Sequence, residues 1–295
     1  MTVSPLRGVA LVLAAAALWG TTGTAQSLAP PQLASVWVGA LRLAVAGLFF
    51  GAWLAIAHAR RGAAEPPTAR LPWPLVVAAA ACMAAYNLAF FAGVRALGVA
   101  VGTALAIGSS PLWGGLLQAV FTRRPPVGVW WGGTVLAVAG GVLLVGEGAR
   151  TASVSVGGVL ACLAAGLSYA AFALLNHGLV ARADPGRVTG AVFTLAALLA
   201  LPAAAAMAGV PAIGTRDLLV VAWLGVASTG VAYLLFSHGL RHISGATGVS
   251  LALFEPVTAF VLAVVVVGER PGGMAVAGLV AVLAGLALVV RAEVR

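Results

Sequence analysis

The chain has 295 residues, of which 62% are hydrophobic and 8% charged, whereas a soluble domain has about 25% charged residues. This composition excludes an ordinary soluble enzyme. The formal net charge of +9 does not indicate nucleic-acid binding, because all sixteen basic residues are arginines that lie mostly between apolar runs. The two cysteines, Cys82 and Cys162, lie within apolar runs and support neither a disulfide framework nor a metal site. We therefore predict an integral membrane protein with no metal, cofactor or nucleic-acid partner.

Apolar runs of about 20 residues, long enough to cross about 30 Å of hydrocarbon as a helix, recur along the chain. The first could also be a signal peptide, but it continues past Trp19 and another span follows, which favours a membrane helix. Ala, Leu, Val and Gly occur without strict alternation, which favours helices over a β-barrel. The sequence thus predicts an all-α integral membrane protein with ten transmembrane helices near residues 7–28, 33–57, 74–95, 100–122, 126–146, 156–180, 187–208, 218–240, 245–267 and 272–291.

The arginines between the spans predict the orientation of the chain. With a cytoplasmic N-terminus, eleven arginines fall on the cytoplasmic side and four on the other side, and Arg42 lies inside a span. Cytoplasmic loops of membrane proteins carry an excess of basic residues. We therefore expect both termini to be cytoplasmic.

The two halves of the chain resemble each other. Residues 91–126 align with residues 236–271, with Pro111 over Pro256. Each half has five predicted spans, and an odd number forces the second copy to enter the membrane in the opposite direction, which suits alternating access to a site near the midplane. We expect two inverted five-helix repeats at residues 1–148 and 149–295.

Pro111 and Pro256 each lie about 11 residues into a span, close to the centre of the bilayer. A proline inside a helix removes a donor and clashes with the carbonyl four residues earlier. We expect both prolines to kink their helices and to free the carbonyls near Ile107 and Ala252. At this depth such carbonyls must face protein or water, although a packing kink without function is the alternative.

Two ionisable residues, Arg42 and Glu255, lie deep inside spans. Each is a functional candidate, because an unpaired charge at mid-membrane costs at least about 2.5–3.5 kcal/mol. They could pair directly or bind a zwitterion whose carboxylate meets Arg42 and whose ammonium meets Glu255. Glu255 could also carry a proton. A structural salt bridge without substrate contact is the remaining alternative.

Further polar and aromatic residues at mid-depth come from several spans and could surround one cavity. Aromatic rings with a few hydrogen-bonding groups suit a small organic molecule, while helix packing is the alternative for each residue. With Arg42 and Glu255, the predicted substrate site contains Trp19, Tyr86, Asn87, Ser109, Ser110, Ser168, Tyr169 and Tyr233. The sequence has no HExxH, GxSxG or Walker A motif and no paired carboxylates at helical spacing, so we do not expect an enzyme.

The order of several motifs resembles a known family. These motifs are the two five-helix repeats, LWG at residues 18–20, Arg42, the two mid-helix prolines, and GERP at residues 268–271. They resemble the EamA-type transporters of the drug/metabolite transporter superfamily, and among these the aromatic amino-acid exporter branch. The resemblance implies a carrier of the bacterial inner membrane. Ser110 and Ser168 stand where an aromatic-selective member is expected to have tryptophan, which indicates a broader amino-acid range.

We therefore expect an exporter of amino acids or related small metabolites that works by alternating access, either as a uniporter or by proton exchange. Its expected partners are the substrate and the lipid bilayer, and a monomer is adequate because two five-helix halves can enclose a cavity. The alternative within transport is a drug or nucleotide-sugar carrier, although a nucleotide sugar would need several cations and only Arg42 is deep enough. A membrane enzyme acting on lipids or an assembly scaffold is the alternative outside transport.

Overall fold

The computed structural model describes residues 4–27, 33–61, 70–145, 155–268 and 270–294, and within these ranges it contains helices and no strands. Eight spans are single helices: α1 (Pro5–Ser27), α2 (Ser35–Arg61), α3 (Trp73–Leu97), α4 (Val99–Thr122), α5 (Gly128–Val145), α6 (Val156–Val180), α7 (Pro185–Ala208) and α12 (Gly273–Val294). In the described ranges, nine spans are long and apolar enough to cross a membrane, and α5 is a shorter apolar helix. The predicted all-α membrane fold is confirmed.

The other two spans are built from shorter segments joined end to end. One consists of α8 (Thr215–Gly225), a π-helical stretch (Val226–Val231) and α9 (Ala232–Gly239). The other consists of α10 (Gly245–Leu251), a 3-10 turn (Ala252–Phe254), α11 (Glu255–Leu262) and a second π-helical stretch (Ala263–Val267). Both irregular spans belong to the second half of the chain.

Local sequence explains where several helices begin and end. The side chains of Ser155, Asp184 and Ser244 accept backbone N–H groups in the first turns of α6, α7 and α10, which satisfies donors that have no partner within the helix. At the opposite ends, Gly98, Gly209 and Gly268 have φ angles of 83°, 65° and 81°. Glycine adopts this left-handed region without steric cost, so the chain can leave the helix there.

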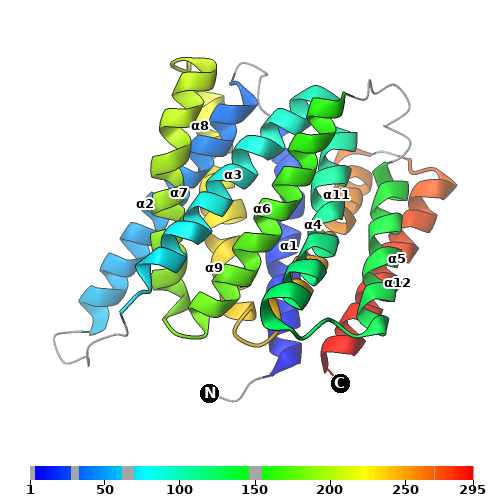
Figure 1. Cartoon of the computed structure of the whole chain (residues 1–295). Coiled ribbons are helices and arrows are strands. Elements are labelled where there is room, and N and C mark those ends of the chain that lie inside the picture. Colours follow the sequence, from blue (N-terminus) through cyan, green and yellow to red (C-terminus); the bar gives the residue numbers. More distant parts are fainter. Residues whose placement is uncertain (1–3, 28–32, 62–69, 146–154, 269, 295) are drawn as a thin grey trace.

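The two halves run in opposite directions and pack on each other reciprocally (Figure 1). Helix α6 of the second half packs on α3 and α4 of the first, and α1 of the first half packs on α9, α10 and α11 of the second. Helix α2 pairs with α7, and α5 pairs with α12. The fold is therefore a pair of inverted five-helix repeats, as predicted. The predicted boundary between residues 148 and 149 lies outside the described residues, so that division of the chain stays a prediction.

Helix α1 begins and α12 ends at the same end of the bundle (Figure 1). We call this end the termini face and the other end the opposite face. The arginine count predicts that the termini face is cytoplasmic.

The pairing of α5 with α12 depends on glycines at the contact. A Cβ atom at Gly140 would lie 2.6 Å from the backbone nitrogen of Val282, and one at Gly133 would lie 2.7 Å from the carbonyl oxygen of Gly285. Small residues allow helix backbones to approach closely in membranes, where van der Waals packing drives helix association. The two helices thus form a tightly joined pair at one side of the bundle.

The two mid-span prolines differ in their local effect. Helix α4 remains α-helical on both sides of Pro111, and the hydroxyls of Ser109 and Ser110 donate to the carbonyl of Ala106 at 3.2 and 2.8 Å. Pro256, in contrast, is the second residue of α11 and directly follows the 3-10 turn with Glu255. The interruption is visible as a change of helix type only in the second copy, and a kink at Pro111 stays a prediction.

Candidate functional site

The bundle contains two adjoining chambers that share lining residues. The outer chamber has a volume of about 420 Å³ and is lined by the C-terminal parts of α1, α3 and α5, the N-terminal half of α4, and α11. It reaches Ser35 in the first turn of α2 and Leu144 in the last turn of α5, so it extends to the opposite face. The inner chamber, of about 50 Å³, lies near the middle of the bundle and shares Trp19, Phe90 and Glu255 with the outer one. A concave site of this combined size suits a small molecule.

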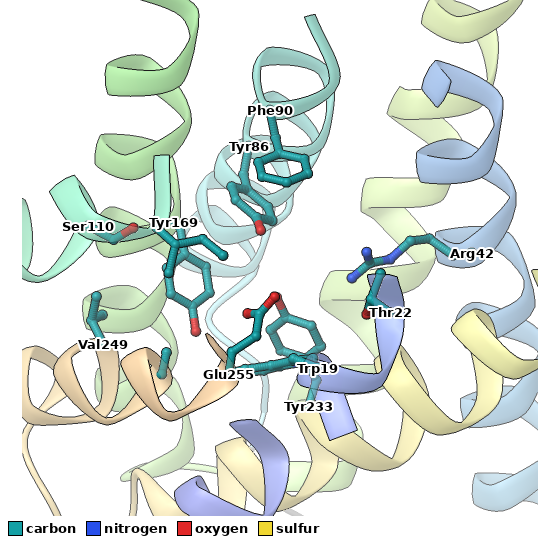
Figure 2. A pocket seen from close by; sticks show the side chains of 12 residues that line it. Trp19, Thr22, Arg42, Tyr86, Phe90, Ser110, Tyr169, Tyr233, Val249 and Glu255 are labelled. Atoms are coloured by element: carbon teal, nitrogen blue, oxygen red, sulfur yellow. The ribbon is translucent and has the colours of Figure 1, made fainter. Parts of the chain in front are cut away.

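Seven of the ten predicted site residues line the inner chamber: Trp19, Arg42, Tyr86, Ser110, Tyr169, Tyr233 and Glu255. They come from seven different helices, so residues that are far apart in the sequence meet at one place (Figure 2). Pro256 lines the outer chamber. The structure therefore brings the two predicted charges together with most of the predicted aromatic residues.

Three predicted site residues do not line either chamber. Asn87 is buried and its side-chain amide donates to the carbonyl of Met83 at 2.9 Å, within its own helix. Ser109 donates to the carbonyl of Ala106 and contacts α6, since a Cβ atom at Gly166 would overlap its hydroxyl. Ser168 is half-buried on α6. The prediction considered only the depth of these residues in the membrane, whereas their side chains lie on sides of their helices that do not face the chambers.

Arg42 and Glu255 reach into the inner chamber from opposite sides (Figure 2). Arg42 is 8% exposed. Both residues are described, and no ion pair within 4.0 Å joins them. Two opposite charges held apart at mid-membrane are costly unless another group compensates them. The space between them is therefore suited to water or to a ligand that carries both signs of charge.

Aromatic rings line the inner chamber on several sides (Figure 2). The ring centroids of Trp19 and Tyr233 are 4.9 Å apart, and those of Tyr86 and Tyr169 are 5.3 Å apart. In the described structure, the indole nitrogen of Trp19 and the hydroxyl of Tyr169 are buried without a hydrogen-bond partner. Buried polar groups nearly always have a partner. Both residues line the chamber, but these two atoms are themselves buried, so a bound molecule can accept from them only after neighbouring side chains move.

Close helix contacts place the residues of the LWG motif. A Cβ atom at Gly20 would lie 2.6 Å from the carbonyl oxygen of Glu255 and 2.6 Å from Cβ of Thr258. Only a glycine therefore lets α1 contact the first turn of α11, and this contact brings Trp19 beside Glu255. In the second half, Gly166 allows α6 to contact α4 in the same way, because a Cβ atom there would lie 2.8 Å from the carbonyl oxygen of Ala106.

The inner chamber also contains residues that the sequence analysis missed: Thr22, Phe90, Ile107, Val249 and Ala252. Helical spacing could have identified three of them. Thr22 follows Trp19 by three residues, Phe90 follows Tyr86 by four, and Ile107 precedes Ser110 by three, and residues at these spacings share a helix face.

At the termini face lies a group of hydrogen bonds that we call the Glu293 clasp, formed by Glu293, Ser244, Thr247 and Trp130. The Glu293 carboxylate, near the end of α12, accepts the backbone N–H of Ser244 at 2.7 Å and its hydroxyl at 3.1 Å, and also accepts the hydroxyl of Thr247. The indole of Trp130 on α5 donates to the Thr247 hydroxyl at 3.1 Å. The clasp thus ties the N-terminus of α10 to both α5 and α12.

Further contacts at the termini face join α6 and α1 to the segment between α9 and α10. His177 is 2.8 Å from the carbonyl oxygen of Leu240, and Arg241 donates to the carbonyl of Val180 at 3.1 Å. The backbone N–H of Ser4 donates to Nδ1 of His242 at 3.3 Å. Burial, together with two neighbouring arginines, lowers the pKa of His242, which favours the neutral ring that can accept this bond.

Within the described ranges, no three or more His, Cys, Asp and Glu side chains gather in a way that could hold a metal ion. The chambers instead offer one cation, one carboxylate, hydroxyl groups and aromatic surface. This set can bind a small molecule by charge and hydrogen bonds.

Known proteins share both the sequence pattern and the architecture. A Bacillus subtilis (strain 168) protein named uncharacterized transporter YwfM is 35% identical over 96% of this chain and 93% of its own length. The threonine/homoserine exporter RhtA of Salmonella typhimurium (strain LT2) is 29% identical over 70% of this chain and 68% of its own. A solved crystal structure with 22% identity covers 97% of this chain and 96% of its own, with a TM-score of 0.78, and shows the same fold. The EamA-like transporter family matches twice, at residues 6–146 and 156–291. The chain belongs to the EamA-like transporter family.

Proposed function

We propose that this transporter exports small zwitterionic metabolites, with amino acids as the first class, by alternating access. The observation that carries the proposal is the pair of opposite, unjoined charges, Arg42 and Glu255, across the inner chamber. A free amino acid has a carboxylate for Arg42 and an ammonium group for Glu255, so one ligand compensates both charges. The likeness to a protein named as a threonine/homoserine exporter supports this substrate class.

The remaining walls support a broad amino-acid range. The buried, unpartnered indole nitrogen of Trp19 and hydroxyl of Tyr169 would become donors for ligand oxygen atoms when the chamber wall shifts on binding. Aromatic rings tolerate aliphatic and aromatic side chains alike, and the outer chamber provides room for the larger ones. Ser110 on the chamber wall leaves space that a tryptophan would fill, so we do not favour a narrow preference for aromatic amino acids.

A nucleotide sugar or another phosphate-rich ligand has less support. Among the described residues that line either chamber, Arg42 is the one basic side chain. A diphosphate carries more negative charge than one guanidinium compensates, and recognition of phosphate usually involves several Arg or Lys side chains. The lining therefore favours a ligand with one carboxylate.

Alternating access follows from the inverted repeats. The outer chamber extends to the opposite face, whereas hydrogen bonds tie α5, α10 and α12 together at the termini face. Exchanging the conformations of the two repeats would close the outer chamber and open an equivalent one between α6, α9, α10, α12 and the second half of α4. In the predicted orientation, the described state is outward-facing and the exchanged state accepts substrate from the cytoplasm. One chain encloses the whole site, which supports a monomeric carrier.

The Glu293 clasp would have to open in the exchanged state, so weakening it should favour that state. Replacing Glu293 by Ala leaves one N–H and two hydroxyls without their acceptor. Ala246 is fully buried beside the clasp, so a cysteine placed there reports on opening. In the Glu293→Ala variant we expect this cysteine to react several times faster with a membrane-impermeant thiol reagent applied to the termini face than it does when Glu293 is present. The background protein has both native cysteines replaced. Arg291→Ala, an exposed change on the same helix, is the control, and equal labelling of the two variants would contradict a gating role for the clasp.

Efflux from proteoliposomes tests the proposed function. Purified protein is reconstituted, the vesicles are loaded with a panel of labelled amino acids, and efflux is followed with and without a pH gradient. We expect efflux of several neutral amino acids above that of protein-free vesicles, and stimulation by the gradient only if protons are exchanged. Folded protein that releases none of the panel would refute the proposal and favour a drug carrier or a non-transporting membrane protein.

A further inference from the structure

The span formed by α8 and α9 is π-helical between Val226 and Val231, and such stretches frequently occur at functional sites. Thr229 lies in this stretch and is completely buried. Its hydroxyl donates to the carbonyl of Leu224, five residues earlier, at 2.7 Å. A hydroxyl has one proton. Since the hydroxyl donates that proton to the Leu224 carbonyl, the Thr229 oxygen can only accept from any further partner.

Arg42 is that further partner. Its Nε–H donates to Oγ1 of Thr229 at 3.1 Å, between α2 and the π-helical stretch. A close helix contact supports the geometry, because a Cβ atom at Gly225 would lie 3.2 Å from the carbonyl oxygen of Arg42. The guanidinium is therefore anchored at a buried acceptor whose orientation is itself fixed.

This anchor decides which part of Arg42 is free for a ligand. A guanidinium can bind a carboxylate in two parallel hydrogen bonds, either through Nε and one terminal nitrogen or through both terminal nitrogens. Thr229 occupies Nε. A carboxylate can therefore bind the edge formed by the two terminal nitrogens. Figure 2 shows the end of the Arg42 side chain directed toward the inner chamber.

We propose that Thr229 is a positioning residue that holds Arg42 with its terminal edge toward the chamber, and that this edge binds the carboxylate of the substrate in two parallel hydrogen bonds. The proposal rests on the proposed function and adds how the carboxylate is recognised. A lysine in place of Arg42 would keep the charge but could not bind Thr229 and a carboxylate in this way. Geometry, and not charge alone, is therefore essential at this position.

The test measures transport in proteoliposomes of the amino acid that the unsubstituted protein carries fastest. In Thr229→Val and in Arg42→Lys we expect KM to rise about tenfold or more, because a charge-assisted hydrogen bond is lost, with the maximal rate little changed. Thr229→Ser keeps the hydroxyl and should restore a KM close to that of the unsubstituted protein. The inhibition constant of the corresponding decarboxylated amine should be unchanged in Thr229→Val, since the amine has no carboxylate for Arg42. Thr194→Val removes an exposed hydroxyl and serves as the control.

The outcomes separate this inference from the proposed function. If the unsubstituted protein carries amino acids and the KM of Thr229→Val equals that of Thr194→Val, the role of Thr229 is refuted while the proposed function stands. If Thr229→Val does not fold, Arg42→Lys decides, and an unchanged KM in that variant refutes the inference. If the unsubstituted protein carries no amino acid, the proposed function fails and this inference fails with it.

Discussion

Replacing Arg42 by Leu is expected to lower kcat/KM for amino-acid transport about 100-fold or more. Truncating one member of a desolvated charge pair typically costs about 2–5 kcal/mol, and every 1.4 kcal/mol is a factor of ten. In this protein the substrate carboxylate would lose its partner, and Glu255 would remain in the chamber without an opposite charge. Initial rates of efflux from proteoliposomes at several internal concentrations measure the effect.

Arg216→Leu is the matched control, because this arginine is exposed at the start of α8 and lies outside both chambers. It should transport like the unsubstituted protein. If Arg42→Leu is monodisperse and transports equally well, Arg42 is not part of the site.

Glu255→Gln separates substrate binding from proton exchange. If the carboxylate binds the substrate ammonium group, the variant should lose transport with and without a pH gradient. If Glu255 carries the coupled proton instead, exchange of substrate across the membrane should continue while the stimulation by a pH gradient disappears. Full, gradient-sensitive transport in Glu255→Gln would exclude both roles.

Replacing Gly140 by Ala is expected to lower the thermal stability of the purified protein markedly, and the yield of monodisperse protein with it. The added methyl group would lie 2.6 Å from a backbone nitrogen and 2.7 Å from a backbone oxygen of α12. Backbone cannot rotate away as a flexible side chain does, so the two helices must separate. Such overpacking typically costs about 1–3 kcal/mol. A thermal-shift assay with size-exclusion chromatography measures the loss.

Gly132→Ala provides the control on the same helix, because a Cβ atom there has no neighbour within 4 Å. Alanine is a better helix former than glycine by about 1 kcal/mol, so this variant should be as stable as the unsubstituted protein or slightly more stable. Equal stability of Gly140→Ala and Gly132→Ala would mean that α5 and α12 are not held at the described distance.

Much of the fold could be predicted because the membrane restricts the choices. An apolar run of this length must form a helix, and the matched prolines in two five-span halves indicate inversion. The irregular segments could not be predicted. The π-helical stretch Val226–Val231 has no proline, and its Ser-Thr-Gly sequence also occurs in regular membrane helices. Tertiary packing against α1 and α2 determines its geometry.

The sequence predicted how deep the site residues lie in the membrane, but not toward which side of the helix each side chain points. Ser109 and Ser110 are neighbours at the same depth, yet they lie about 100° apart around the helix, and Ser110 alone lines a chamber. Asn87 follows Tyr86 in the same way and bonds within its own helix. Thr229 was missed because a Ser-Thr pair in a largely apolar span gives no sign that its threonine holds an arginine of another helix.

The most direct test of a chamber that holds a zwitterion between Arg42 and Glu255 is competition in a counterflow assay. Proteoliposomes are loaded with an unlabelled amino acid, and uptake of the labelled form is measured against analogues that lack either the carboxylate or the amino group. We expect that only competitors with both charged groups inhibit strongly. Equal inhibition by the single-charge analogues, or by an uncharged molecule of the same size, would contradict it.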